Sequence, residues 1–279
     1  LLSSTHDEAL RLAQGNHVGN QRFRVLLSLS RQRYLQAYSD LSFFTCSSSL
    51  GKDATKLFNY VSGYAEAEGL NHLSIAPSFL FNDLLAYIDA EINAALSGKP
   101  ARIWAKMNSI MERNIIDALY KASQAGVKID LVVRGICGVR PGVKGLSENI
   151  RVKSVVGLFL EHSRIVCFSN GVDLPHKNAL VFISSADWMG RNLHARVEIM
   201  VKIQNQTVKA QILNQIMAAN LADTRNSWVL NADGKYSRDT ENLGEVSFNC
   251  HRFFMENPSI SGRGKVGAKD VPELTHLND

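Results

Sequence analysis

His162 and Arg164 are the first residues of this sequence whose types and spacing suggest chemistry. They open an apolar run, residues 162–168, that is typical of a buried strand. Because side chains alternate along a strand, the two share one face, where an imidazole can act as acid, base or nucleophile beside an arginine that binds phosphate. A lone histidine on such a strand is usually a core residue, but an arginine is costly to bury unpaired, which favours a functional site. Glu161 is interpreted as a salt-bridge partner rather than as a catalyst.

A hairpin would bring more polar residues to this pair. The apolar runs 162–168 and 179–184 are joined by a segment full of turn residues. Folding the two runs together places His162 close to the residues that follow the second run, among them Ser185 and Asp187. We expect Asp187 to fix the tautomer of the imidazole while Arg164 holds phosphate oxygens in a bidentate contact.

Two more basic residues come at the ends of predicted strands. Lys106 is near the end of one strand, and Arg134 directly follows another. Ligands of parallel α/β sheets bind beyond the carboxyl ends of the strands. Asn108 and Ser109 are expected to open a helix there, and the free N–H groups of a helix start attract anions. This arrangement predicts a phosphate site; the alternative is that both cations are ordinary surface charges.

The elements that must position these residues are those of an α/β domain. Alternating and helical apolar patterns predict strands at residues 101–108, 127–133, 149–156 and 196–203, and helices at residues 53–66, 81–96, 110–125 and 206–223. Strand, helix and strand from residue 101 to residue 133 form a βαβ unit, and hence a parallel pair.

The remaining segments have weaker patterns. Residues 22–30 could be a strand, and residues 69–80 are interpreted as a linker. Beyond residue 238 the chain turns polar, and residues 259–279 are expected to be a mobile tail because they are rich in Gly, Ser and Lys. Ser261–Lys265 in this tail could alternatively be a second phosphate contact. His251 has no ligand-like spacing and is given no role.

Composition excludes some classes of protein. The 279 residues carry a net charge of +5 with a pI of about 9.0, which suits a polyanionic partner without requiring one. No apolar run is long enough to span a membrane. The four cysteines form no CxxC pair, which indicates reduced thiols and a cytoplasmic location. The sequence starts without Met, so we expect the natural N-terminus to lie upstream.

The histidine motif is a loosened form of the HxK…SxN signature of the phospholipase D superfamily. Arg164 stands where that signature has Lys, and Asp187 where Asn is usual. Ser169 replaces the acid that normally intervenes. These departures argue against ordinary phosphodiesterase action by this half of the chain alone.

The surrounding segments are more specific, and the chain resembles the C-terminal half of polyphosphate kinases of the first class over roughly residues 36–265. The segments that carry this resemblance are AKMNSI, ALYKASQAGVKIDLVVRGICGVRPGVKGLSENIRVKSVVG, FLEHSRI, ISSADWMGRNLHARVEIMV and NPSISGRGK. The resemblance implies an α/β fold, a phospholipase D-like mixed β-sheet flanked by helices, after a truncated domain of the same kind. It implies a remnant of the first domain at 1–68, the second domain at 69–245 and a C-terminal tail at 246–279.

The same resemblance implies reversible transfer of the terminal phosphate of ATP to inorganic polyphosphate, with Mg²⁺ and through a phosphohistidine. By matching position, it assigns contacts with ATP/ADP or its phosphates to Tyr38, Arg134 and His162, with His162 as a second catalytic histidine. Lys106, Arg164 and Asp187 complete the predicted phosphate site. The family also implies a homo-oligomer and peripheral association with membranes; no nucleic acid is expected as a partner.

The phosphorylated histidine itself is not assigned. His6 lies near the right distance before Tyr38, but it has no lysine partner, and the two acids that follow it would repel an incoming phosphate. His17 fits no better, and the metal ligands are unknown. The chain alone is therefore expected to be inactive or to bind polyphosphate without making it. Two alternatives stay open: a non-catalytic polyanion-binding module and a phospholipase D-like phosphodiesterase acting on lipid or nucleic acid.

Overall fold

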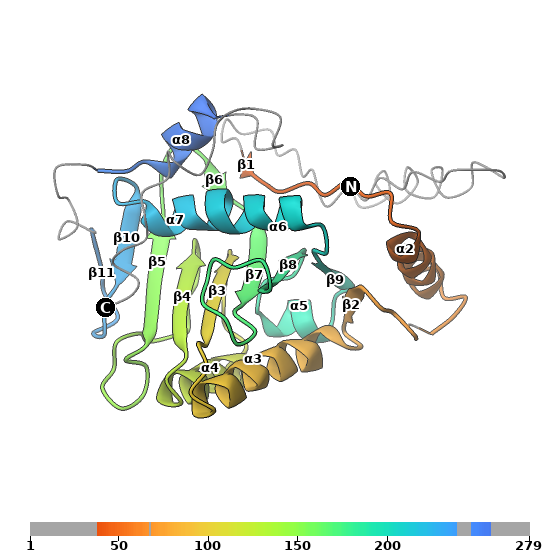
Figure 1. Cartoon of the computed structure of the whole chain (residues 1–279), viewed down its shortest axis with the longest axis horizontal. Coiled ribbons are helices and arrows are strands. Elements are labelled where there is room, and N and C mark those ends of the chain that lie inside the picture. The colour runs from red at the N-terminus through yellow and green to blue at the C-terminus, as the bar shows by residue number, and fades with distance from the viewer. Residues whose placement is uncertain (1–37, 67, 239–246, 258–279) are drawn as a thin grey trace.

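The computed structural model describes residues 38–66, 68–238 and 247–257, and a mixed β-sheet is its largest element (Figure 1). In this part of the chain nine strands follow the order β11-β10-β5-β4-β3-β7-β8-β9-β2. β3, β4 and β5 run parallel, and every other neighbouring pair is antiparallel. The bounds are β2 Leu73–Ala76, β3 Arg102–Met107, β4 Lys128–Val133, β5 Ile150–Val155, β7 Arg164–Phe168, β8 Leu180–Ser184, β9 Glu198–Lys202, β10 Ser227–Leu230 and β11 Tyr236–Arg238. Two short strands, β1 (Tyr38–Ser39) and β6 (Leu160–Glu161), form a separate parallel pair.

Helices cover both faces of the large sheet. One face carries α3 and α4, and the other carries a continuous helix from α6 to α7 (Figure 1). The bounds are α2 Ser48–Val61, α3 Leu80–Leu96, α4 Arg113–Gln124, α5 Gly190–His194, α6 Gln206–Gln211, a π-helical segment Ile212–Met217, α7 Ala218–Ala222 and α8 Cys250–Glu256. Among these helices, none is both long and apolar enough to cross a membrane.

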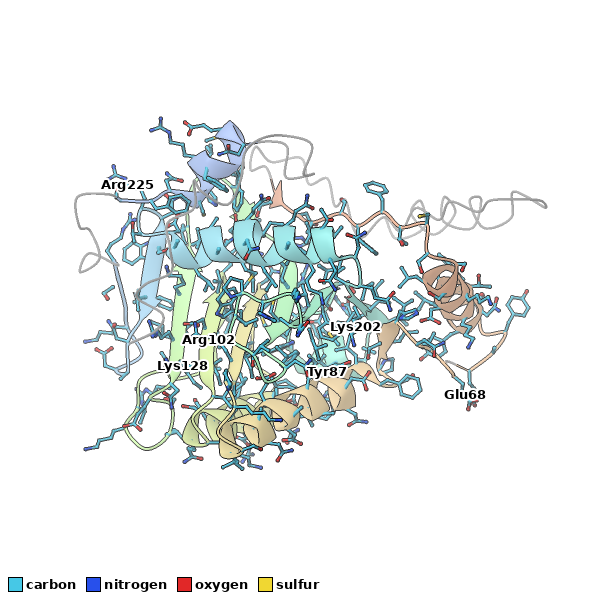
Figure 2. The ribbon with its side chains drawn as sticks, viewed as in Figure 1. Glu68, Tyr87, Arg102, Lys128, Lys202 and Arg225 are labelled. Atoms are coloured by element: carbon cyan, nitrogen blue, oxygen red, sulfur yellow. The ribbon has the colours of Figure 1, made fainter. Side chains whose placement is uncertain are left out.

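The two apolar layers follow from the alternation of side chains along the strands. In β3, Ile103 and Ala105 face α3 and α4, whereas Trp104 faces the α6–α7 helix. On the first of these faces, Tyr87 of α3, labelled in Figure 2, stacks against Phe168 and Phe182 of the sheet. Because both faces are covered, β3 is buried along its whole length, including its two cations, Arg102 and Lys106.

The central predictions are confirmed. β3 and β4 are parallel with Arg102 opposite Lys128, as the βαβ unit requires. β7 and β8 form the predicted hairpin, with Arg164 opposite Ser184. The mixed sheet with helices on both faces agrees with the expected fold class.

Two predictions are wrong, and one pair of strands was not predicted. The segment interpreted as a linker contains β2, which pairs with β9 at the edge of the sheet. β10 and β11 form an antiparallel pair in a segment where no strand was predicted. Part of the segment interpreted as a tail is α8, whose Cys250 and His251 are fully buried. Each of these elements is short, so its sequence has no clear periodic pattern. Contacts with residues far away in the sequence hold it in place.

Some predictions fall outside the described residues. They concern the strand at 22–30, His6, His17 and the stretch Ser261–Lys265.

Candidate functional site

Polar residues from several elements meet at one edge of the large sheet. Parallel β3 and β4 end together, and β7 begins beside the end of β3 because it runs the opposite way. β8 ends opposite the first residue of β7, so the loop after it reaches the same edge. Asn108, Arg134, Arg164 and Asp187 come together there, and His162 directly precedes the start of β7.

Asp187 is the centre of this group. Its carboxylate accepts hydrogen bonds from the backbone N–H of Asn108 at 2.8 Å and from the Asn108 side-chain amide at 3.1 Å. Arg164 donates to both carboxylate oxygens, from Nε at 3.2 Å and from Nη2 at 3.1 Å. The Asp187 side chain is only 10% exposed and that of Arg164 14% exposed. This paired charge ties the β8 loop to the ends of β3 and β7.

Asn108 also binds Arg134. Its side-chain oxygen accepts hydrogen bonds from Arg134 Nη2 at 2.7 Å and Nε at 3.1 Å. One amide therefore binds Asp187 with its nitrogen and Arg134 with its oxygen. The guanidinium of Arg134, half-buried at the end of β4, is held in a fixed orientation toward the same edge as Arg164.

His162 lies at the other end of the group. Its Nδ1 is 3.2 Å from a carboxylate oxygen of Asp40, and its side chain is 16% exposed. Because an ionised carboxylate can only accept, Nδ1 is the donor to Asp40, and in the neutral form of the ring Nε2 keeps a lone pair. Arg164 Nη1 lies close to both ring nitrogens, 3.4 Å from Nε2 and 3.5 Å from Nδ1, and donates to the His162 carbonyl oxygen at 3.2 Å. Arg134, Asn108, Asp187, Arg164, His162 and Asp40 thus form one connected series of polar contacts.

The geometry differs from the expected roles of two residues. The imidazole contacts the carboxylate of Asp40, whereas Asp187 holds Arg164 and Asn108. Ser185 turns away from the site and bonds with Glu198 of β9. Sequence reasoning missed Asp40 because it lies 122 residues from its partner and no periodic pattern marks a two-residue strand.

The helix after β3 also begins later than expected. α4 starts at Arg113, with Glu112 as its N-cap, so the N-cap predicted at Asn108 or Ser109 is wrong. The N–H groups of Asn108 and Ser109 point at Asp187 instead. The anion that these groups attract is therefore the protein's own carboxylate.

Lys106 does not reach this edge, which corrects its predicted role as a phosphate contact. Its ammonium is buried behind the site, 2.8 Å from Glu161 and 2.7 Å from the Ser163 hydroxyl. Burial alone would raise the pKa of Glu161, but the Lys106 charge and the hydrogen bond from His251 lower it to about 2. The interpretation of Glu161 as a salt-bridge partner is confirmed.

The backbone of Tyr38 lies near the site. β1 pairs with β6 so that Tyr38 lies opposite Leu160 and Ser39 opposite Glu161. The Ser39 carbonyl accepts the backbone N–H of His162 at 3.0 Å. The backbone of the predicted nucleotide tyrosine thus lies next to the strand that precedes His162.

Gly135 is required where the chain leaves β4. A Cβ there would lie 2.8 Å from the Asn108 carbonyl oxygen. We expect Gly135→Ala to lower the free energy of unfolding by about 1–3 kcal/mol, because the backbone that carries Asn108 must shift. Urea denaturation measures this loss. Gly190→Ala is the control, since a Cβ at Gly190 meets nothing within 4 Å; equal losses would contradict the prediction.

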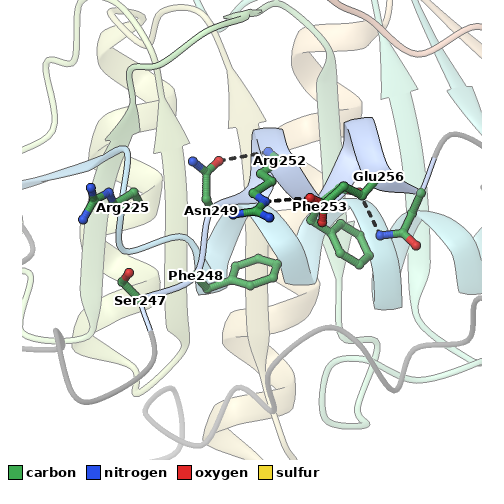
Figure 3. Close-up of a pocket in the computed structure, with 8 residues that line it drawn as sticks. Arg225, Ser247, Phe248, Asn249, Arg252, Phe253 and Glu256 are labelled. Atoms are coloured by element: carbon green, nitrogen blue, oxygen red, sulfur yellow. Dashed lines mark hydrogen bonds and ion pairs between the residues drawn. The ribbon is translucent and has the colours of Figure 1, made fainter.

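A separate hollow of about 690 Å³ lies along α8 (Figure 3). Its lining includes Arg225, Phe248, Arg252 and Glu256, and none of the residues around His162. Arg252 pairs with Glu256 at 2.6 Å along the helix. This hollow shows that one side of α8 faces solvent.

The described residues contain no group of three or more His, Cys, Asp or Glu side chains that could hold a metal ion. The site at the sheet edge instead offers two guanidinium groups, one imidazole and two carboxylates. Such a set can bind phosphoryl oxygens and exchange a proton at Nε2 of His162.

Comparisons with known proteins agree with one another. The family model "Polyphosphate kinase C-terminal domain 2" matches residues 73–250. The polyphosphate kinase of Erythrobacter litoralis is 56% identical over 238 residues, covering 85% of this chain and 33% of that protein. The Synechocystis polyphosphate kinase is 48% identical over 199 residues, covering 71% and 26%. The crystal structure of polyphosphate kinase from Porphyromonas gingivalis matches with a TM-score of 0.75 and 32% identity, covering 82% of this chain and 34% of that one. The chain thus spans about a third or less of the length of these proteins.

Proposed function

This chain belongs to the polyphosphate kinase family, and we propose that it provides the nucleotide- and polyphosphate-binding half of an ATP:polyphosphate phosphotransferase. One observation carries the proposal: Arg134, Arg164 and His162 gather at the carboxyl edge of the parallel strands. Phosphoryl transfer depends on positioning and on stabilising charge spread over phosphate oxygens, and this edge offers the groups for both.

The roles of the residues follow from their contacts. Arg134, oriented by Asn108, and Arg164, oriented by Asp187, would each bind oxygens of neighbouring phosphates. His162 would accept or return a proton at Nε2, and Asp40 would hold the proton on Nδ1. Mg²⁺ would arrive as the complex with ATP or ADP, because Mg²⁺ is commonly bound through substrate phosphates.

Other properties are proposed from the family resemblance alone. They are a homo-oligomeric state, a cytoplasmic location and peripheral membrane association. The four cysteines are all free, which is compatible with a reducing compartment.

We expect His162→Ala to weaken the binding of ADP or tripolyphosphate by about ten- to a hundredfold, because a hydrogen bond to a charged group contributes about 1.5–3 kcal/mol. Isothermal titration with the 279-residue chain measures this change, and thermal unfolding measures separately what the loss of the 16% exposed side chain does to folding. His176→Ala is the matched control, since His176 lies in the loop between β7 and β8, at the far end of the hairpin. A large loss of thermal stability with unchanged binding would mean that His162 is a core residue.

Labelled ATP separates the proposal from its alternatives. Label that is acid-labile and base-stable would indicate a phosphohistidine and support the kinase. Without covalent label, binding of ATP that ADP displaces supports the nucleotide-binding half, whereas binding of tripolyphosphate but not of ATP would favour a polyanion-binding module. Cleavage of a phosphodiester substrate would favour a phosphodiesterase.

A further inference from the structure

Three ionisable side chains are buried together directly behind His162. Lys106, Glu161 and His251 are each no more than 3% exposed. Glu161 joins the other two: one of its oxygens lies 2.8 Å from Lys106 Nζ, and the other lies 2.8 Å from His251 Nε2. We call Lys106, Glu161 and His251 the buried cluster.

Such a cluster is poorly explained as a source of stability. Removing two opposite charges from water costs several kcal/mol for each ion, and well-packed apolar side chains of similar volume are often as stable or more so. A chain that needed only a stable core here could use apolar residues. The location of the cluster therefore calls for another explanation.

The contacts of Lys106 provide that explanation. Its ammonium binds the Glu161 carboxylate and also the Ser163 hydroxyl, at 2.7 Å, and the Ser163 carbonyl oxygen, at 3.3 Å. Glu161 and Ser163 are the residues immediately before and after His162. One buried ammonium thus holds the chain on both sides of His162, which fixes the point from which the imidazole extends toward the site.

His251 connects α8 to the same point. Its Nδ1 is the acceptor for the backbone N–H of Phe159 at 3.4 Å, so Nε2 carries the proton that it donates to Glu161. Gly157 packs so closely that a Cβ there would lie 2.6 Å from His251 Nδ1. α8 is itself attached to the domain, because Asp223 accepts the Cys250 N–H at 2.8 Å.

α8 therefore has two different sides. Cys250 and His251 are buried against the domain, whereas Arg252 and Glu256 line the open hollow of Figure 3. Its buried side contacts the segment that leads into His162, and through this side α8 can influence the site without touching it.

We propose that Glu161 is a positioning residue for His162, held in place by Lys106 from β3 and by His251 from α8. This inference rests on the proposed function of His162 as the phosphate-contacting histidine. Glu161 acts through the backbone and never touches the substrate. α8 then belongs to the machinery that holds the site, although it lies outside the sheet edge where the substrate would bind.

The test uses the 279-residue chain labelled with ¹⁵N-histidine, with the ring signals of His162 identified by their loss in His162→Ala. Glu161→Gln keeps the shape of the side chain and removes its charge. We expect altered ring nitrogen shifts of His162, reporting a changed balance of its tautomers, and about tenfold weaker binding of tripolyphosphate, because small displacements of a contacting group reduce its effect by large factors. Glu91→Gln is the matched control: Glu91 is a carboxylate of α3 that is 2% exposed and lies against Ser169 and Asn170.

A purely structural role gives a different result. If Glu161→Gln lowers thermal stability but leaves both the His162 shifts and the tripolyphosphate affinity as in the unmodified chain, the inference is wrong. Should this variant fail to fold, Lys106→Met/Glu161→Leu removes both charges together and avoids an unpaired one. If the ring shifts of His162 in this double variant match those of the unmodified chain, the inference is wrong. Altered shifts support it. If the unmodified chain binds no tripolyphosphate, the proposed function fails, while the ring shifts still decide the positioning role.

Discussion

Lys106→Met is expected to lower the free energy of unfolding by about 3–5 kcal/mol, because it leaves the Glu161 carboxylate buried without its cation. The Lys106 side chain is 2% exposed and that of Glu161 3% exposed, so water cannot replace the lost partner. Met fills a similar volume, which confines the change mainly to the charge. Urea denaturation at pH 7 measures the loss.

The loss of stability in Lys106→Met should become smaller as the pH falls. In the unmodified chain the pKa of Glu161 is about 2, below its ordinary value of 4.5. The ionised carboxylate therefore contributes stability that is complete above about pH 5 and is lost as the pH falls toward 2. In Lys106→Met, burial instead raises the pKa of Glu161, so the carboxyl takes up its proton earlier. The difference in stability between the two proteins should be largest near pH 7 and should narrow below pH 5.

Lys209→Met provides the matched control. Lys209 is 8% exposed, but its ammonium donates to the Lys177 carbonyl oxygen, and burial together with the nearby Lys202 lowers its pKa. Removing this charge should change stability by no more than about 1 kcal/mol, because no buried carboxylate loses a partner. Equal losses in the two Met variants, or a loss for Lys106→Met that does not change with pH, would contradict the account of the buried pair.

Six of the nine strands in the large sheet of the described residues could be predicted from the sequence, because each coincides with a short apolar run, but only the β3–β4 and β7–β8 pairings were predicted. The apolar runs 162–168 and 179–184 flank one turn, so the register of β7 and β8 followed from symmetry about that turn. The same register predicts Arg164 and Asp187 at one end of the hairpin, where the two side chains form an ion pair. Strands that are buried on both faces have apolar runs that stand out in the sequence, and the central strands of this sheet are covered by helices on both faces.

The contacts that orient the site could not be predicted in the same way. Asp40 approaches His162, and His251 approaches Glu161, across 122 and 90 residues of chain. Asp40 directly follows a strand of two residues and His251 lies in a helix of seven, and both elements are too short for a periodic pattern. Lys106 was predicted at the sheet edge because it is near the end of β3, but its ammonium pairs with the buried Glu161, a contact that no local pattern indicates.

Asp187→Ala is expected to have the second large effect, a loss of about 3–5 kcal/mol in the free energy of unfolding. The substitution leaves Arg164, 14% exposed, without its bidentate partner. It also removes the acceptor of the Asn108 backbone and side-chain N–H groups. The loop after β8 would then lose its attachment to the ends of β3 and β7. Thermal and urea unfolding measure the loss, and Asp117→Ala is the control, because its pair with Arg113 is exposed and should contribute less than about 1 kcal/mol.

Inorganic phosphate adds a sharper test of the same variant. Without the Asp187 carboxylate, the donors of Asn108 and Arg164 face a space that an anion can enter. Phosphate should therefore raise the melting temperature of Asp187→Ala more than that of the unmodified chain, where the carboxylate already occupies these donors. Sulfate should act similarly and chloride less, since only the tetrahedral oxyanions offer several acceptors to a guanidinium group. If phosphate stabilises both proteins equally, the anion binds elsewhere, and Asp187 does not occupy an anion site.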